Sequence, residues 1–178
     1  MTTDPHDKNR RYPIGPLPQL SPDQRTPEAL DGFAVSMEEA VAEWRGLVGG
    51  LTRPELARTY RPGSWTAGQL AHHAAEAHLH GLMRLKAGLT LDNFVIQPFD
   101  QDAALTLPDA ALPVSAALDM LDALNLHWTA LLRGVESGQF ARQVIHPQEG
   151  TQDVWQLVAK HDWHLRHHLA QARAALTD

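Results

Sequence analysis

Apolar residues recur at spacings of three and four in four separate segments, and this pattern constrains the fold more than any other feature of the sequence. In an α-helix this spacing places the apolar side chains on one face, which must be buried against another element. No segment shows the convincing alternation of a β-strand. The pattern therefore predicts an all-α fold, an antiparallel four-helix bundle with helices over about 27–48, 66–89, 114–135 and 151–176.

The remaining segments predict one domain with an arm and two long connections. Residues 1–25 contain five prolines among charged residues, so we expect an extended arm on the surface of a single bundle domain over 26–178. Residues 90–113 are longer than a usual connection, which indicates a crossover of the bundle or a functional loop. Residues 134–150 are irregular, with room for a short strand pair around 143–145.

Composition excludes several classes of protein. The 15 Lys and Arg residues against 21 Asp and Glu residues give a net charge of −6, which argues against a nucleic-acid-binding protein. The absence of cysteine removes disulfide scaffolds, thiolate zinc sites and cysteine nucleophiles, and it is compatible with a cytoplasmic protein. We see neither a membrane-spanning run nor the apolar core of a signal peptide. We therefore expect a cytoplasmic protein that binds neither nucleic acid nor membrane.

Histidine is the unusual residue: eight of the 11 histidines lie in two short stretches, over 72–80 and 161–168. His164 and His168 are four residues apart, so their imidazoles share a helical face at a distance that one metal ion can bridge. His73 lies on the inward stripe of its own helix and supplies a third ligand. Three histidines would leave a fourth position open, as in catalytic zinc sites. From spacing alone, a metal site and a set of hydrogen-bonded core histidines are equally supported.

Two residues near these histidines are candidates for proton transfer. Glu76 lies one turn beyond His73, and His161 lies one turn before His164 on the same face. Glu76 is equally consistent with an exposed helix carboxylate. We expect three other histidines to lie off the inward stripes and at the surface: His72, His78 and His167. The Glu-x-x-His pairs of di-iron bundles, HExxH and the phosphate-binding loop are absent.

A series of short motifs in one order resembles the DinB/YfiT superfamily, and its YfiT-like branch in particular. The motifs cover most of the chain: Tyr12-Pro-Ile-Gly, Tyr60-Arg-Pro-Gly-Ser-Trp-Thr, Gln69-Leu-Ala-His-His, Arg84-Leu-Lys, Ile96-Gln-Pro-Phe-Asp, Trp128-Thr-Ala-Leu-Leu-Arg, His146-Pro and Trp163-His-Leu-Arg-His-His-Leu-Ala. The resemblance implies a four-helix bundle, often dimeric, with a divalent metal on His73, His164 and His168. Trp44, Trp65 and Trp163 exceed what a small bundle needs inside, which also favours a homodimer.

The resemblance implies chemistry of two kinds. In the first, one divalent ion per chain, zinc or nickel, activates a low-molecular-weight thiol of the bacillithiol type, which attacks an electrophilic substrate. In the second, a hydrolase uses metal-bound hydroxide with Glu76 or His161 as proton acceptor. A non-enzymatic metal-binding bundle is a third reading. Ala104 and Gln97 depart from the family pattern in the crossover, so substrate specificity is expected to differ there.

Overall fold

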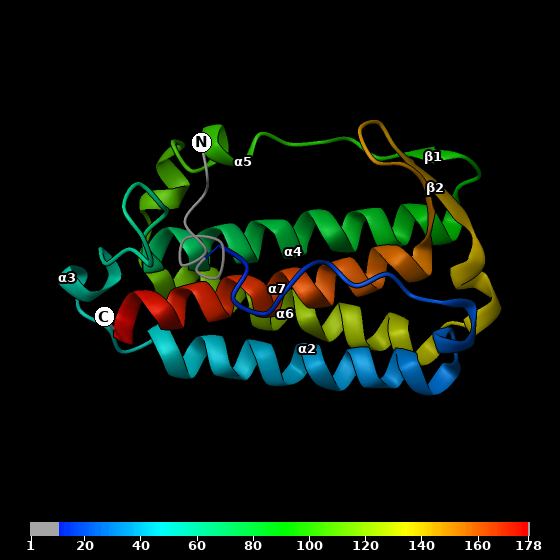
Figure 1. Cartoon of the computed structure of the whole chain (residues 1–178), viewed down its shortest axis with the longest axis horizontal. Coiled ribbons are helices and arrows are strands. Elements are labelled where there is room, and N and C mark those ends of the chain that lie inside the picture. The colour runs from blue at the N-terminus through cyan, green and yellow to red at the C-terminus, as the bar shows by residue number, and fades with distance from the viewer. Residues whose placement is uncertain (1–10, 178) are drawn as a thin grey trace.

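Four long helices packed side by side form the body of the protein in a computed structural model, which describes residues 11–177 (Figure 1). Their bounds are α2 (Pro27–Val48), α4 (Ala67–Thr90), α6 (Val114–Gly134) and α7 (Val154–Thr177). The predicted all-α four-helix bundle is therefore confirmed, and three of the four starting points lie within one residue of the prediction. Among the described residues, no helix combines the length and hydrophobicity that crossing a bilayer requires.

Local chemistry accounts for where two of these helices begin. The Thr26 hydroxyl caps α2 by accepting a hydrogen bond from the Ala29 N–H, and Pro27 occupies the first helical position. A capping box starts α4, in which the Thr66 side chain accepts from Gln69 N–H and the Gln69 side chain accepts from Thr66 N–H. The capping box fixes where α4 begins, and α4 is the helix that carries His73.

The predicted antiparallel arrangement holds for some neighbouring helices and is wrong for others. Helices α2 and α4 each pack against both α6 and α7, so α2 and α4 lie across the diagonal from each other. Figure 1 shows α4 and α6 running in one direction and α2 and α7 in the other. Two neighbouring pairs are therefore parallel, because the connection between α4 and α6 carries the chain back along the whole length of the bundle. Residues 91–113 are this crossover, as their length indicated.

Several short helices and strands lie between the long helices and in the arm. Strand β1 (Phe94–Val95) of the crossover pairs in parallel with β2 (Gln143–His146), which pairs antiparallel with β3 (Gly150–Asp153). The predicted strand pair around 143–145 is confirmed, and β3 occupies the residues where a helical start was expected, so α7 begins at Val154. The other short elements are α3 (Arg53–Leu56), α5 (Gln101–Ala104) and the 3-10 helices η1 (Pro22–Gln24), η2 (Pro108–Ala111) and η3 (Ser137–Ala141).

The described part of the arm, residues 11–25, follows α7 (Figure 1). The Gln156 side-chain amide donates to the Pro18 carbonyl at 2.8 Å and accepts from the Leu20 N–H at 3.2 Å. Arg25 forms a salt bridge with Asp153 at the start of the same helix. These contacts hold the arm against the bundle, while residues 1–10 of the predicted arm lie outside the described part of the chain.

Large apolar side chains fill the centre of the bundle. Trp44 and Trp128 are fully buried, and the Trp44 indole donates a hydrogen bond to the Leu165 carbonyl across the core. Trp44 is thus a core residue and gives no support for a dimer interface, and Trp65 and Trp163 are only partly buried. The homodimer stays a prediction, which sedimentation at micromolar concentration would test.

Candidate metal centre

Three histidines from two helices lie together: His73 of α4, and His164 and His168 of α7. One ring nitrogen from each histidine can serve as a ligand, and these three nitrogens lie within 4.8 Å of one another. The Nε2 atom of His164 is 3.3 Å from Nε2 of His73 and 3.1 Å from Nε2 of His168. The structure therefore brings together the three residues that helical spacing selected. The metal-binding role itself stays a prediction that these contacts support.

The spacing of these nitrogens fits one tetrahedrally coordinated ion. Zinc–nitrogen bonds of about 2.0–2.1 Å place two tetrahedral ligands roughly 3.4 Å apart, close to the separations within this cluster. Without an ion, each contact between two imidazole nitrogens needs an N–H on one ring and a lone pair on the other. The neutral rings bring more lone pairs than protons to these contacts. The residues present thus suit a divalent cation with one position left open.

A glutamine sets the tautomer of His168. The Gln171 side-chain nitrogen donates to the Arg11 carbonyl at 2.9 Å, and since a carbonyl can only accept, the orientation of the amide is fixed. The Gln171 oxygen then accepts from Nδ1–H of His168 at 2.8 Å. Nε2 of His168 consequently carries the lone pair and faces the cluster, as a metal ligand must.

Burial keeps the three imidazoles neutral. It lowers the pKa of His73 to about 4 and the pKa values of His164 and His168 well below the ordinary value, and the neighbouring imidazoles lower the last two further. Metal binding needs unprotonated nitrogen, so protons compete with an ion only at a pH well below the 6.5 of a free imidazole.

An indole and a carboxylate border the cluster. The Trp65 ring packs against His73 and His168, with centroids 4.6 and 5.9 Å away. Its Nε1 donates to the Asp102 carboxylate at 2.9 Å, and Asp102 belongs to the crossover helix α5. This contact ties the crossover to the start of α4 beside the three histidines.

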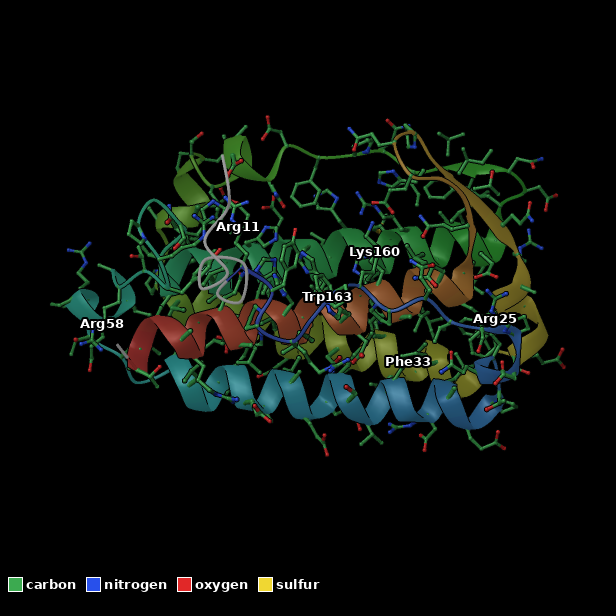
Figure 2. The ribbon with its side chains drawn as sticks, viewed as in Figure 1. Arg11, Arg25, Phe33, Arg58, Lys160 and Trp163 are labelled. Atoms are coloured by element: carbon green, nitrogen blue, oxygen red, sulfur yellow. The ribbon has the colours of Figure 1, made fainter. Side chains whose placement is uncertain are left out.

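Two cavities adjoin the cluster. The first has a volume of about 490 Å³ and the second about 420 Å³. Both are lined by His164 and by Gln101 and Asp102 of α5. Lys160 lines the first and Trp163 the second, and both side chains lie in the middle part of α7 (Figure 2). A molecule in either cavity could therefore reach the open position of a metal on the three histidines.

The two predicted proton-transfer residues have different surroundings. His161 is buried and lines the first cavity, with its ring against Trp128 at a centroid distance of 5.4 Å. Burial lowers the pKa of His161 well below its ordinary value. Glu76 is partly buried and lines neither cavity, and burial raises the pKa of this carboxyl. His161 is the better placed of the two, and no catalytic role for either is established.

The expectation that His78 and His167 lie at the surface is wrong. His78 is buried with its ring stacked on Trp128 at 5.3 Å, and His167 is buried beside Gln171, whose side chain contacts its Nε2 at 3.0 Å. Helices α4 and α7 each pack against two other long helices, so their buried faces are wider than one stripe of spacings three and four. His72 is partly buried, with Nε2 bonded to the Leu112 carbonyl, away from the cluster.

Sequence reasoning missed several residues of the site: Trp65, Asp102, Gln171 and Arg84. Gln171 carried a usable signal, because it follows His168 by three residues and so lies on the same helical face. No comparable signal marked Asp102, which reaches the site from the crossover.

Comparison with known proteins agrees with this geometry. A "Putative metal-dependent hydrolase" from Bacillus pumilus is 33% identical over 161 residues, which cover 90% of this chain and 91% of the relative. One from Halalkalibacterium halodurans, BH0277, is 32% identical over 168 residues, covering 94% and 97%. The structure of Bacillus subtilis YfiT, titled a "probable metal-dependent hydrolase with an unusual four-helix bundle topology", superimposes with a TM-score of 0.82 at 32% identity over 93% of this chain and 94% of YfiT. The sequence pattern of the DinB superfamily matches residues 36–172, and the chain therefore belongs to the DinB superfamily, in its YfiT-like group.

Proposed function

We propose that this protein is a divalent-metal-dependent enzyme that transfers a low-molecular-weight thiol, of the bacillithiol type, to an electrophilic substrate. The observation that supports this proposal is the pair of cavities beside the three histidines. A transfer reaction needs room for two molecules on either side of the reacting centre, whereas hydrolysis needs one substrate and water. Each cavity falls within the size range of small-molecule sites.

A divalent ion held by His73, His164 and His168 would supply a Lewis acid that lowers the pKa of a thiol or water at its open position. The chain's own residues do the rest. Gln171 orients His168 so that its Nε2 faces Nε2 of His164, where it would be a ligand of the ion. His161 lines the first cavity and would be the proton acceptor for a molecule bound there, although burial lowers its pKa and so makes it a weak base.

Hydrolysis is the second candidate, and the names of the relatives favour it. It would use the same three ligands and the same proton acceptor, with one substrate in the first cavity. The two functions differ in the nucleophile alone, so a product analysis separates them.

The test compares water with thiols as nucleophiles. The metal content of the purified protein is first measured by elemental analysis, and the protein is then incubated with a chlorinated nitroarene as model electrophile, with and without a small thiol. We expect the thiol conjugate to form faster than in a buffer control, and His164→Ala to lose both the metal and the excess rate. Hydrolysed product without conjugate would favour the hydrolase, and metal binding without turnover of either kind would contradict both.

A further inference from the structure

Arg84 is a partly buried cation that lines the first cavity and forms no salt bridge with a described carboxylate. It lies on α4, lines the cavity, and its Nη2 donates to the Gln97 carbonyl of the crossover at 2.9 Å. Its guanidinium carbon lies 6.0 Å from the centre of the Phe99 ring. Within residues 11–177, no carboxylate comes within salt-bridge distance of this guanidinium. The neutral Gln97 carbonyl and the face of the Phe99 ring therefore contact the guanidinium where water would contact an exposed one.

Other arginines of the protein differ from Arg84 in this respect. Six arginines form a salt bridge with at least one carboxylate, although three of them, Arg45, Arg133 and Arg173, are more accessible to water than Arg84. The six are Arg25, Arg45, Arg133, Arg142, Arg166 and Arg173. A guanidinium stays charged at any physiological pH, so it cannot avoid the cost of burial by losing its proton. A buried charge is normally paired, and an unpaired one inside a cavity indicates a partner that comes with the ligand.

The other charged residues that line the cavity have direct partners other than Arg84. Lys160 lines the same cavity and is already paired with Glu149, which also lines it. That pair contributes no net charge. Two more carboxylates line the cavity, and each has a partner of its own: Asp100 accepts from the Asp102 and Ala103 N–H groups, and Asp102 accepts from the Trp65 indole. Glu149 attracts Arg84 from beyond salt-bridge distance. The guanidinium therefore has no direct carboxylate contact, which one carboxylate of a ligand would supply. The planar fork of nitrogens on an arginine also matches a carboxylate with two hydrogen bonds.

From this arrangement we infer that Arg84 binds a carboxylate on one of the two molecules that react at the metal centre, and so selects acidic substrates. This inference rests on the proposed function and specifies its substrate class. Arg84 is far from the three histidines along the bundle: it lies 11 residues beyond His73 on α4, which is roughly 16 Å at the helical rise. Lys160 is nearer to them, because it lies one turn, about 6 Å, from His164 along α7. The carboxylate would therefore lie at the opposite end of the molecule from its reacting atom.

Two thiols of equal length test this inference by binding. 6-Mercaptohexanoate carries a carboxylate and 6-mercaptohexan-1-ol a neutral hydroxyl, and their dissociation constants with the metal-loaded protein are measured by calorimetry. A charge-assisted hydrogen bond predicts that the wild type binds the acid about tenfold more tightly than the alcohol. We expect Arg84→Gln to abolish this preference and Arg84→Lys to restore part of it. Lys86→Gln, which removes the same charge from an exposed position on α4, should leave the preference unchanged.

Each outcome bears on the inference separately from the proposed function. Equal binding of the two thiols by the wild type, or an unchanged preference in Arg84→Gln, would overturn it. If Arg84 only anchors the crossover, Arg84→Gln should lower the melting temperature and weaken the binding of both thiols equally. This result would also overturn the inference. Loss of the preference in Arg84→Gln without any thiol transfer would keep the carboxylate site and reject the proposed function. Thiol transfer without a carboxylate preference would support the proposed function and reject the carboxylate site.

Discussion

The substitution Gly81→Ala tests the packing around His161. Gly81 is buried in α4, and a Cβ atom added there would lie 2.5 Å from both Cε1 and Nδ1 of the His161 ring and 2.8 Å from its Nε2. The ring has little freedom to move, because it is buried and packs against Trp128. The absence of a side chain at Gly81 is therefore what makes room for His161.

The expected change in stability follows from two opposing effects. Overpacking a core costs about 1–3 kcal/mol, and contacts this short place Gly81→Ala near the upper end. Alanine gains about 1 kcal/mol over glycine within a helix, which leaves a net loss of roughly 2 kcal/mol. For a domain of this size, the melting temperature should fall by about 4–8 °C.

Gly32→Ala is the matched control, because Gly32 also lies within a long helix and a Cβ there would meet no atom within 4 Å. This variant should gain about 1 kcal/mol and melt about 2–4 °C higher. Both melting temperatures are measured by circular dichroism, with the metal content determined in parallel. We expect Gly81→Ala to retain the metal, since His161 is outside the three-histidine cluster. A Gly81→Ala protein that melts at or above the wild-type temperature would refute the placement of His161 against α4.

Three further predictions concern the metal, the pH dependence and the arm. His73→Ala should lose the metal while His72→Ala keeps it, because the His72 ring bonds to a carbonyl away from the cluster. Elemental analysis of both variants checks this, and metal loss in His72→Ala would mean that His72 is the ligand. Burial lowers the pKa of His78 to about 4, from the 6.5 expected in the unfolded chain. The metal-free protein should therefore lose stability as the pH falls from 6.5 toward 4, and urea titrations should show a smaller loss of stability in His78→Gln. Gln156→Ala removes two hydrogen bonds to the arm, so limited proteolysis should cleave residues 11–25 faster than in the wild type; equal rates would show that other contacts hold the arm.

The helices and the three histidines were predictable because they depend on local rules. Helical periodicity depends on neighbours three and four residues away, so the stripes located α2 and α6 and the spacing put His164 and His168 on one face. Turn and capping residues such as Thr26 and Thr66 marked the starts of α2 and α4. The start of α7 was less predictable, because pairing of β3 with β2 competes with helix formation there.

Burial was predicted less well than helix position. The exposure of His78 and His167 depends on how many neighbours each helix has, and a stripe of spacings three and four describes only one contact face. The resemblance of the motifs did not correct this, because those motifs identify a family and say little about which side chains are covered.

By itself, the sequence determined the fold class, the four helices and the set of histidines able to meet, because each of these follows from residue type and helical period. Only the tertiary structure shows that α4 and α6 run in the same direction, that two cavities adjoin the histidines, and that Arg84 forms no salt bridge with a described carboxylate. These properties depend on contacts between segments that are distant in the chain. The crossover and α7 surround α4 only after folding, and no local pattern records which charges they bring to it.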